Sequence, residues 1–200
     1  MRRIQVYSPK AARMLVFFSY EGVAAWVLAE SCPLVQTFCE HPGFVQVDGV
    51  PVMADLWVSG DQREHFVRIE GGIELCAELP EQVLTYPDAE VSRVSADWLA
   101  QHRVWIDNWL QINPYLVANA RFVTPATLER VTALFDDARP LFDAEHAIRD
   151  LDVQLVRTAI FMLMHQGKLC SDDLAVRPLA STTVFRRGGV QPHSSRSWMP

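Results

Sequence analysis

The sequence has little of the positive charge that bulk binding to nucleic acid requires. Among its 200 residues, 24 Asp and Glu outnumber 18 Lys and Arg, so the formal net charge is −6. Non-specific DNA binding depends on clustered Lys and Arg that neutralise phosphates. The composition therefore argues against a chain that binds DNA by charge alone, although a partner protein could still deliver it to DNA. The cations are mostly arginines, which favour planar, bidentate contacts.

Cysteine pairs with the spacing of a zinc site or a disulfide framework are also absent. The four cysteines stand at positions 32, 39, 76 and 170 and form no Cys-x-x-Cys pair, so we expect reduced thiols in a cytoplasm. No apolar run reaches 18 residues, and the N-terminus has no long apolar segment. We therefore expect a cytoplasmic protein with no membrane association.

The composition that is present is typical of a globular protein. Half of the residues are hydrophobic and 21% are charged, and a chain of this length can form one large domain or two small ones. Residues 1–13 are basic and include Ser8-Pro9, which predicts an extended arm. The arm is either a loose tail kept soluble by its charge or a contact to the DNA backbone.

Residues 14–70 alternate between helical and strand periodicity. Apolar residues recur at helical spacing after Glu21, and Pro33 ends that helix. Asp48-Gly49 between two apolar segments is a strong hairpin signal, and Gly71-Gly72 stops the last strand. The expected elements are a helix over 21–30 and strands over 35–38, 44–47, 50–58 and 65–70.

Helical patterns dominate after residue 95. Ser95 or Asp97 is expected to cap a first helix, which Asn113-Pro114 should break. Thr124 as N-cap followed by Pro125 predicts another helix, and a helix over 150–165 should end at Gly167. The expected domains are a basic arm (1–13), a first domain (14–115), a helical domain (116–187) and a disordered tail (188–200).

Several segments match, in order, the motifs of a known family. Glu21 heads a helix that is followed by PLVQTFCEHP at 33–42, MADLWV at 53–58, FVRIE at 66–70 and the run from 161 to 183. In this order they resemble the TnsA-like transposon endonucleases. The resemblance implies an α/β fold, in which a restriction-endonuclease-like mixed-sheet domain precedes a helical, winged-helix-like domain.

The same resemblance implies a function and a set of site residues. The family cuts the 5′ strand at transposon ends together with a DDE transposase, under an AAA+ ATPase regulator. Transposon-end DNA, the transposase and the ATPase are thus the expected partners. The implied catalytic residues are Glu21, Asp55, Arg68 and Glu70, and the three carboxylates among them would bind Mg²⁺ or Mn²⁺.

The chemistry explains why such a site needs carboxylates. A divalent cation offsets charge on the scissile phosphate and activates the attacking water, and Mg²⁺ prefers carboxylate oxygens. This chain departs from the family pattern because Glu70 replaces a Lys, Arg68 replaces an acidic or amide residue, and His41 replaces a Gln. The resemblance therefore leaves enzymatic activity open.

Each site residue also has a structural interpretation. Asp55 could be a solvated strand residue, Glu21 a charge favoured at a helix N-terminus, and Arg68 could pair with Glu70 across one strand face. Two alternative functions follow. The first is a catalytically inactive adaptor of the same fold, and the second is a winged-helix DNA-binding regulator in which residues 14–70 form a sensor domain.

Overall fold

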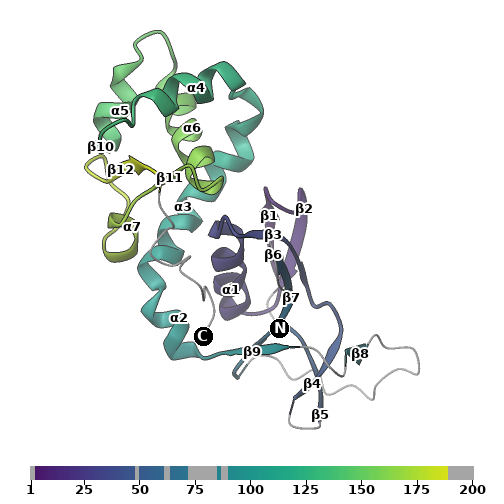
Figure 1. The fold of residues 1–200 in the computed structure, drawn as a ribbon. Coiled ribbons are helices and arrows are strands. Elements are labelled where there is room, and N and C mark those ends of the chain that lie inside the picture. The colour runs from purple at the N-terminus through teal and green to yellow at the C-terminus, as the bar shows by residue number, and fades with distance from the viewer. Residues whose placement is uncertain (1–2, 48–49, 61–63, 72–84, 87–89, 189–200) are drawn as a thin grey trace. The chain divides into compact units, whose positions relative to one another are not determined.

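The computed structural model describes residues 3–47, 50–60, 64–71, 85–86 and 90–188 (Figure 1). The protein is a mixed α/β chain whose described residues separate into two compact units. One comprises the residues up to 101 apart from 31–33, and the other comprises 31–33 and the residues from 102 onward. The position expected for the domain boundary, 115–116, lies inside a helix of the second unit. The tail expected after residue 188 lies outside the described residues.

The first unit contains three sheets, the largest of which has four strands in the order β3-β6-β7-β9. β3 and β6 pair antiparallel, as do β6 and β7, whereas β7 and β9 pair parallel. The elements of this unit are β1 (Ile4–Ser8), β2 (Arg13–Phe17), α1 (Tyr20–Ser31), β3 (Val35–Glu40), β4 (Phe44–Val47), β5 (Val50–Met53), β6 (Leu56–Gly60), β7 (Glu64–Ile69), β8 (Thr85–Tyr86), β9 (Val91–Val94) and α2 (Ala96–Gln101).

The N-terminal residues are not a loose arm. β1 and β2 form an antiparallel hairpin in which Tyr7 faces Met14. Leu15 and Phe17 of β2 are buried, so this hairpin contributes apolar side chains to the core. The sequence analysis did not predict this pairing, because it interpreted the segment from its basic residues. The alternating apolar residues between them are what favour strand pairing.

The strand expected over 50–58 is two strands that belong to two sheets. β5 pairs with β4, as the hairpin signal predicted, whereas β6 pairs with β3 and β7. At the change of sheet, Ala54 N–H donates to Gly43 O at 2.9 Å. Ala54 is fully buried with Val45 and Phe66, so packing fixes this corner. The corner places Asp55 at the start of β6.

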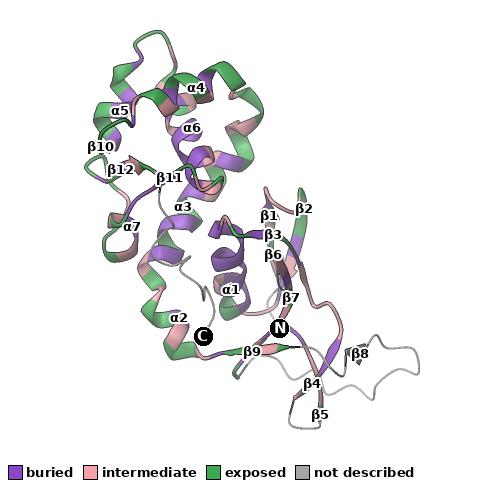
Figure 2. Ribbon diagram, in the orientation of Figure 1, coloured by how far each residue is buried: buried purple, intermediate pink, exposed green. Residues whose placement is uncertain are grey.

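The second unit is mainly helical and has one small sheet in the order β10-β12-β11. Burial is greatest along α6, whose residues Val156, Ile160 and Phe161 are fully enclosed (Figure 2). The elements are α3 (Arg103–Asn119), η1 (Ala120–Phe122), α4 (Pro125–Ala133), β10 (Arg139–Pro140), α5 (Leu141–Ala147), α6 (Val153–His165), β11 (Leu169–Cys170), α7 (Asp173–Val176) and β12 (Val184–Arg187).

The helix boundaries confirm two sequence predictions and correct a third. Thr124 caps α4 by accepting from Thr127 N–H, and Gly167 has a positive φ of 72° directly after α6. Pro114, however, does not break α3, which continues to Asn119. Proline removes the bond to the carbonyl four residues earlier. Both Pro114 and Leu110 are exposed, so water can satisfy that carbonyl.

No helix in the described parts of the chain is both long and apolar enough to cross a membrane.

Candidate functional site

Asp55 is held at the corner between β5 and β6 by its backbone. Its N–H donates to Val67 O on β7 at 2.8 Å, and its carbonyl accepts from His41 N–H at 3.1 Å. These bonds tie the corner to a neighbouring strand and to the turn after β3. These backbone hydrogen bonds alone therefore hold Asp55 in place.

The Asp55 carboxylate accepts from two donors. Arg68 Nη1 lies 2.9 Å and Ile69 N lies 2.8 Å from Asp55 Oδ2. The exposed fractions of the two side chains are 13% for Arg68 and 15% for Asp55, so water screens the pair only partly. Charge-assisted bonds are stronger in such surroundings than on an open surface. Asp55 thus has a cationic partner within its own chain.

The predicted site residues do not all come together. Asp55 and Arg68 form an ion pair, whereas Glu21 in the first turn of α1 and Glu70 after β7 are both exposed. The alternative pairing of Arg68 with Glu70 is not observed. Within the described residues, Glu70 makes no ion pair.

The arrangement does not fit a magnesium or manganese site. Mg²⁺ takes hard oxygen ligands, usually carboxylates, and the described residues include no group of three His, Cys, Asp or Glu that could hold a metal ion. Asp55 Oδ2, which would be the ligand from the strand, already accepts from a guanidinium and an amide.

His41 occupies a strained turn beside this corner. Its φ is 50°, a left-handed conformation uncommon for residues other than glycine. Its ring centroid lies 5.6 Å from that of Phe18 and 6.4 Å from that of Phe17. Its Nε2 is buried and has no hydrogen-bond partner in the described structure. His41 is thus a turn residue in an apolar setting.

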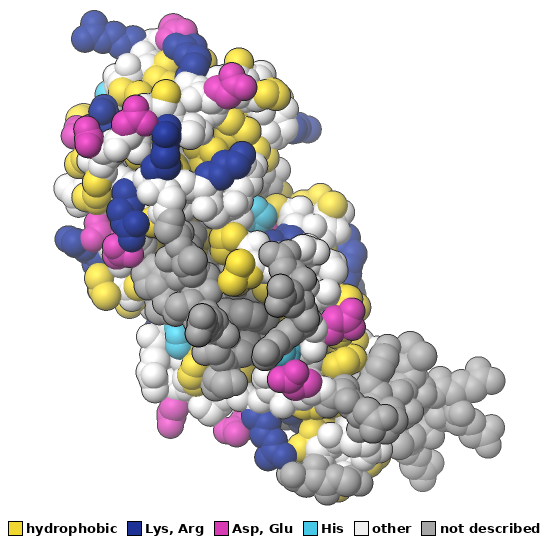
Figure 3. All heavy atoms as spheres, in the orientation of Figure 1, with side chains coloured by type: hydrophobic (Ala, Val, Ile, Leu, Met, Phe, Trp, Pro, Cys, Tyr) yellow, Lys and Arg dark blue, Asp and Glu magenta, His cyan; other side chains and the backbone are white. Residues whose placement is uncertain are grey.

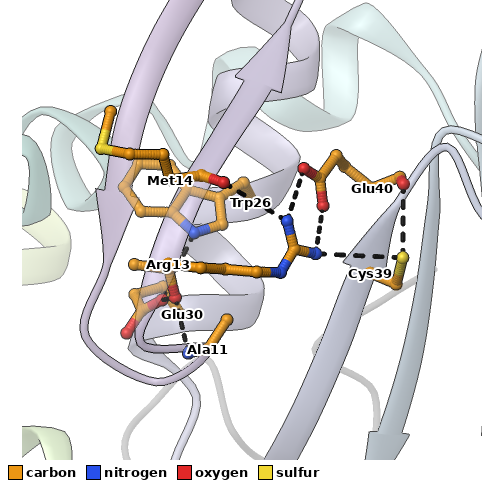
Figure 4. Close-up of polar contacts among 8 residues, drawn as sticks. Ala11, Arg13, Met14, Trp26, Glu30, Cys39 and Glu40 are labelled. Carbon is orange, nitrogen blue, oxygen red and sulfur yellow. Dashed lines mark hydrogen bonds and ion pairs between the residues drawn. The ribbon is translucent and has the colours of Figure 1, made fainter.

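Arg13 and Glu40 form a pair that the sequence did not predict (Figure 4). Arg13 Nη1 and Nη2 donate to Glu40 Oε1 and Oε2 at 2.8 and 2.5 Å. Burial raises the pKa of Glu40, but the hydrogen bond and charge of Arg13, together with backbone hydrogen bonds, outweigh burial, so this pKa lies below the ordinary 4.5. Burial also raises the pKa of the adjacent Cys39 thiol, which disfavours a reactive thiolate.

Glu30 is a second polar anchor of the same hairpin. It is 2% exposed and lies near the end of α1. Ser8 Oγ, Lys10 N and Trp26 Nε1 donate to its carboxylate at 2.5, 3.0 and 3.3 Å. These bonds fasten the β1–β2 hairpin to α1 (Figure 4). In the sequence, these bonds are indicated by Glu30 itself, a glutamate in an otherwise apolar stretch of helix.

The segment between β11 and β12 is pinned to α3 by one buried amide. Asn108 is 1% exposed, and its Nδ2 donates to Leu174 O and Arg177 O, each at 2.9 Å. Its Oδ1 accepts from Leu179 N at 2.7 Å. Every hydrogen-bonding group of the amide except one acceptor lone pair is thus used. The segment that includes α7 is therefore held against the helix.

Three arginines of the second unit are engaged with carboxylates. Arg186 lies 3.1 Å from Asp172, and Arg187 lies 3.1 Å from Asp136. Arg157, the only cation on α6 besides its final histidine, pairs with the buried Glu145 and donates to Tyr115 Oη at 2.9 Å. On the face drawn in Figure 3, Lys and Arg side chains are interspersed with Asp and Glu rather than gathered in one patch.

No protein-family model matches the chain, and no curated protein matches it. Function is therefore inferred from the residues themselves and their contacts.

Proposed function

We propose that this protein is a non-catalytic assembly subunit of a DNA transposition complex, related in fold to the TnsA-like endonucleases. The observation that carries the proposal is the Asp55–Arg68 pair. In a nuclease of this type the strand carboxylate binds the metal ion, and here a guanidinium neutralises it instead. An arginine supplies positive charge but cannot generate a metal-bound hydroxide.

The topology supports the first half of the assignment. A helix that begins beside Glu21 precedes a mixed sheet, in which Asp55 directly precedes β6 and Arg68 lies on the adjacent strand β7. This is the order of elements that the family resemblance implies for a restriction-endonuclease-like domain. The altered positions lie at one corner of the sheet, so the fold would be retained while the chemistry is lost.

The second unit supports a winged-helix-like domain that contacts protein. Its order is α3, η1, α4, β10, α5, α6, β11, α7 and β12, and the small sheet runs β10-β12-β11. In winged-helix DNA binders the wing and the last helix contact DNA. Here Asn108 holds the segment between the last two strands, and the arginine of α6 is paired with Glu145. This unit therefore favours a protein partner over DNA.

By the resemblance, the partners are a DDE transposase and an AAA+ ATPase regulator. A chain with a net charge of −6 has little to gain from phosphate contacts. We expect it to reach transposon-end DNA through the transposase. The alternative of a winged-helix DNA-binding regulator is disfavoured, because Arg157, Arg186 and Arg187 are paired with carboxylates and are not free to contact DNA.

A cleavage assay tests the absence of catalysis. The purified chain is incubated with a supercoiled plasmid and either Mg²⁺ or Mn²⁺, alone and with a DDE transposase. We expect no nicking that distinguishes the native chain from Asp55→Ala. Metal-dependent nicking that disappears in Asp55→Ala would show that the protein is a nuclease.

An assembly assay tests the positive half of the proposal. We expect the chain to co-purify with that transposase when both are expressed together, and transposition to require the chain. The exposed variant Glu21→Gln should leave both properties unchanged, since Glu21 has no catalytic role in a non-catalytic subunit. Failure to bind the transposase, or loss of transposition in Glu21→Gln, would overturn the proposal.

A further inference from the structure

One face of α3 is exposed along its whole length. The exposed positions recur every three or four residues, which is the spacing of neighbours on one side of a helix. The opposite side carries Trp105, Trp109 and Ile112, all buried. The exposed face, which we call the α3 stripe, consists of Arg103, Asp107, Leu110, Pro114 and Val117, and is continued by Arg121 in η1.

The centre of the α3 stripe is apolar. Leu110 is 40% and Val117 is 43% exposed, and the exposed Pro114 lies between them. Phe122, which is 54% exposed, adds to this surface, with Arg121 Cζ 4.6 Å from its ring centroid. Single exposed apolar residues are ordinary, but neighbouring ones on one helix face mark a contact surface.

Opposite charges flank the apolar centre of the stripe: Asp107, whose Oδ2 lies 3.6 Å from Arg103 Nε, precedes it, and Arg121 follows it. Asp107 lies seven residues before Pro114 and Arg121 lies seven residues after it. At 1.5 Å per residue, Asp107 is about 10 Å from the proline along α3, and Arg121 lies beyond the end of α3, in η1. Leu110 and Val117 flank the proline at four and three residues. The stripe is therefore close to self-complementary about Pro114.

We propose that two copies of this protein associate through their α3 stripes, in antiparallel orientation around a two-fold axis at Pro114. The axis brings Asp107 of each copy opposite Arg121 of the other and Leu110 opposite Val117. Such an interface uses the same patch on both subunits, so each favourable contact occurs twice. A parallel arrangement would instead place Asp107 against Asp107, and like charges would oppose it.

The contact is weak and reversible. Exposed ion pairs contribute little energy, so Asp107 and Arg121 set the register while the apolar centre supplies the affinity. This inference does not rest on the proposed function, since a dimer and a monomer could each bind a transposase.

Sedimentation equilibrium over a concentration series tests the dimer. The native chain should be a concentration-dependent dimer, and Leu110→Glu should be a monomer. Asp107→Arg should raise the Kd about tenfold or more, because two contacts per dimer become repulsive. The double change Asp107→Arg and Arg121→Asp should restore the native Kd.

Val176→Glu is the matched control. Val176 is 74% exposed on α7, away from the stripe in sequence, so this variant should dimerise like the native chain. Circular dichroism checks that each variant keeps its helices, which is expected because every changed residue is exposed. A native chain that stays monomeric throughout, or a dimer that Leu110→Glu and Asp107→Arg leave intact, would overturn the inference.

Discussion

Replacing Asn108 with Asp tests how the second unit holds the segment between β11 and β12. The two side chains have nearly the same shape, so packing around the 1%-exposed position changes little. Asp keeps the acceptor for Leu179 N–H but loses both donors. The carbonyls of Leu174 and Arg177 then face a carboxylate oxygen instead of an amide.

The cost follows from these lost bonds. Each buried polar group left without a partner costs about 1–3 kcal/mol. Leu174 is buried, whereas Arg177 is exposed and water can reach its carbonyl. The loss therefore comes mainly from the Leu174 carbonyl and should lower the free energy of unfolding by about 2 kcal/mol, a substantial part of what holds a small domain folded. A protonated Asp can donate to one of the carbonyls, so the loss should be smaller in acid than at neutral pH.

Urea unfolding followed by tryptophan fluorescence measures this loss, because Trp105 and Trp109 belong to the same helix. Gln111→Glu is the control, since it makes the same amide-to-carboxylate change on the exposed side of α3. It should shift stability by no more than about 0.5 kcal/mol. If Asn108→Asp unfolds within about 1 kcal/mol of the native chain, the amide does not pin the segment.

Two further predictions concern paired charges. Arg157→Met should lower the free energy of unfolding by about 3–5 kcal/mol, because it leaves the 3%-exposed Glu145 without its cation. Adding Glu145→Gln should recover part of that loss in urea unfolding, and a double variant no more stable than the single one would contradict this. Glu40 has a lowered pKa, so its pair with Arg13 stabilises the fold above the unfolded-state pKa and is lost as the pH falls through the folded-state pKa. Stability measured between about pH 5 and pH 3 should thus fall less steeply in Glu40→Gln than in the native chain, and parallel slopes would refute the pairing.

Local signals in the sequence predicted the elements that local chemistry controls. The cap at Thr124, the stop at Gly167 and the hairpin of β4 and β5 each depend on a few neighbouring residues. The division of residues 50–58 into β5 and β6 was missed because it depends on partners far along the chain. Both halves have strand character, and only pairing and the burial of Ala54 separate them.

Prolines and charges were misjudged for a similar reason. Pro114 was expected to end a helix, but its cost is small where the freed carbonyl meets water. Arg13 was expected to lie in a loose arm because its partner Glu40 is 27 residues away. Asn108, by contrast, left a readable signal, since a polar residue among the apolar positions of α3 must find buried partners.

The sequence named two residues that the structure pairs, but it did not predict their pairing. The sequence singled out Asp55 and Arg68, and the structure joins them directly, 13 residues apart. Strand alternation had suggested Arg68 with Glu70, two residues apart on one face. The register between β6 and β7 determines which carboxylate pairs with Arg68. It sets Leu56 opposite Val67, so Asp55, which precedes Leu56, lies beside Arg68.

The way this chain uses arginine bears on how it meets DNA. Arg13, Arg68 and Arg157 each bind a carboxylate of their own unit, and so do Arg130, Arg177, Arg186 and Arg187. A phosphate that recruited one of these cations would have to displace its carboxylate, which would then sit beside the phosphate as a like charge. Contacts between this protein and a nucleoprotein complex are therefore expected at apolar surfaces, and their strength should depend less on salt than phosphate contacts do.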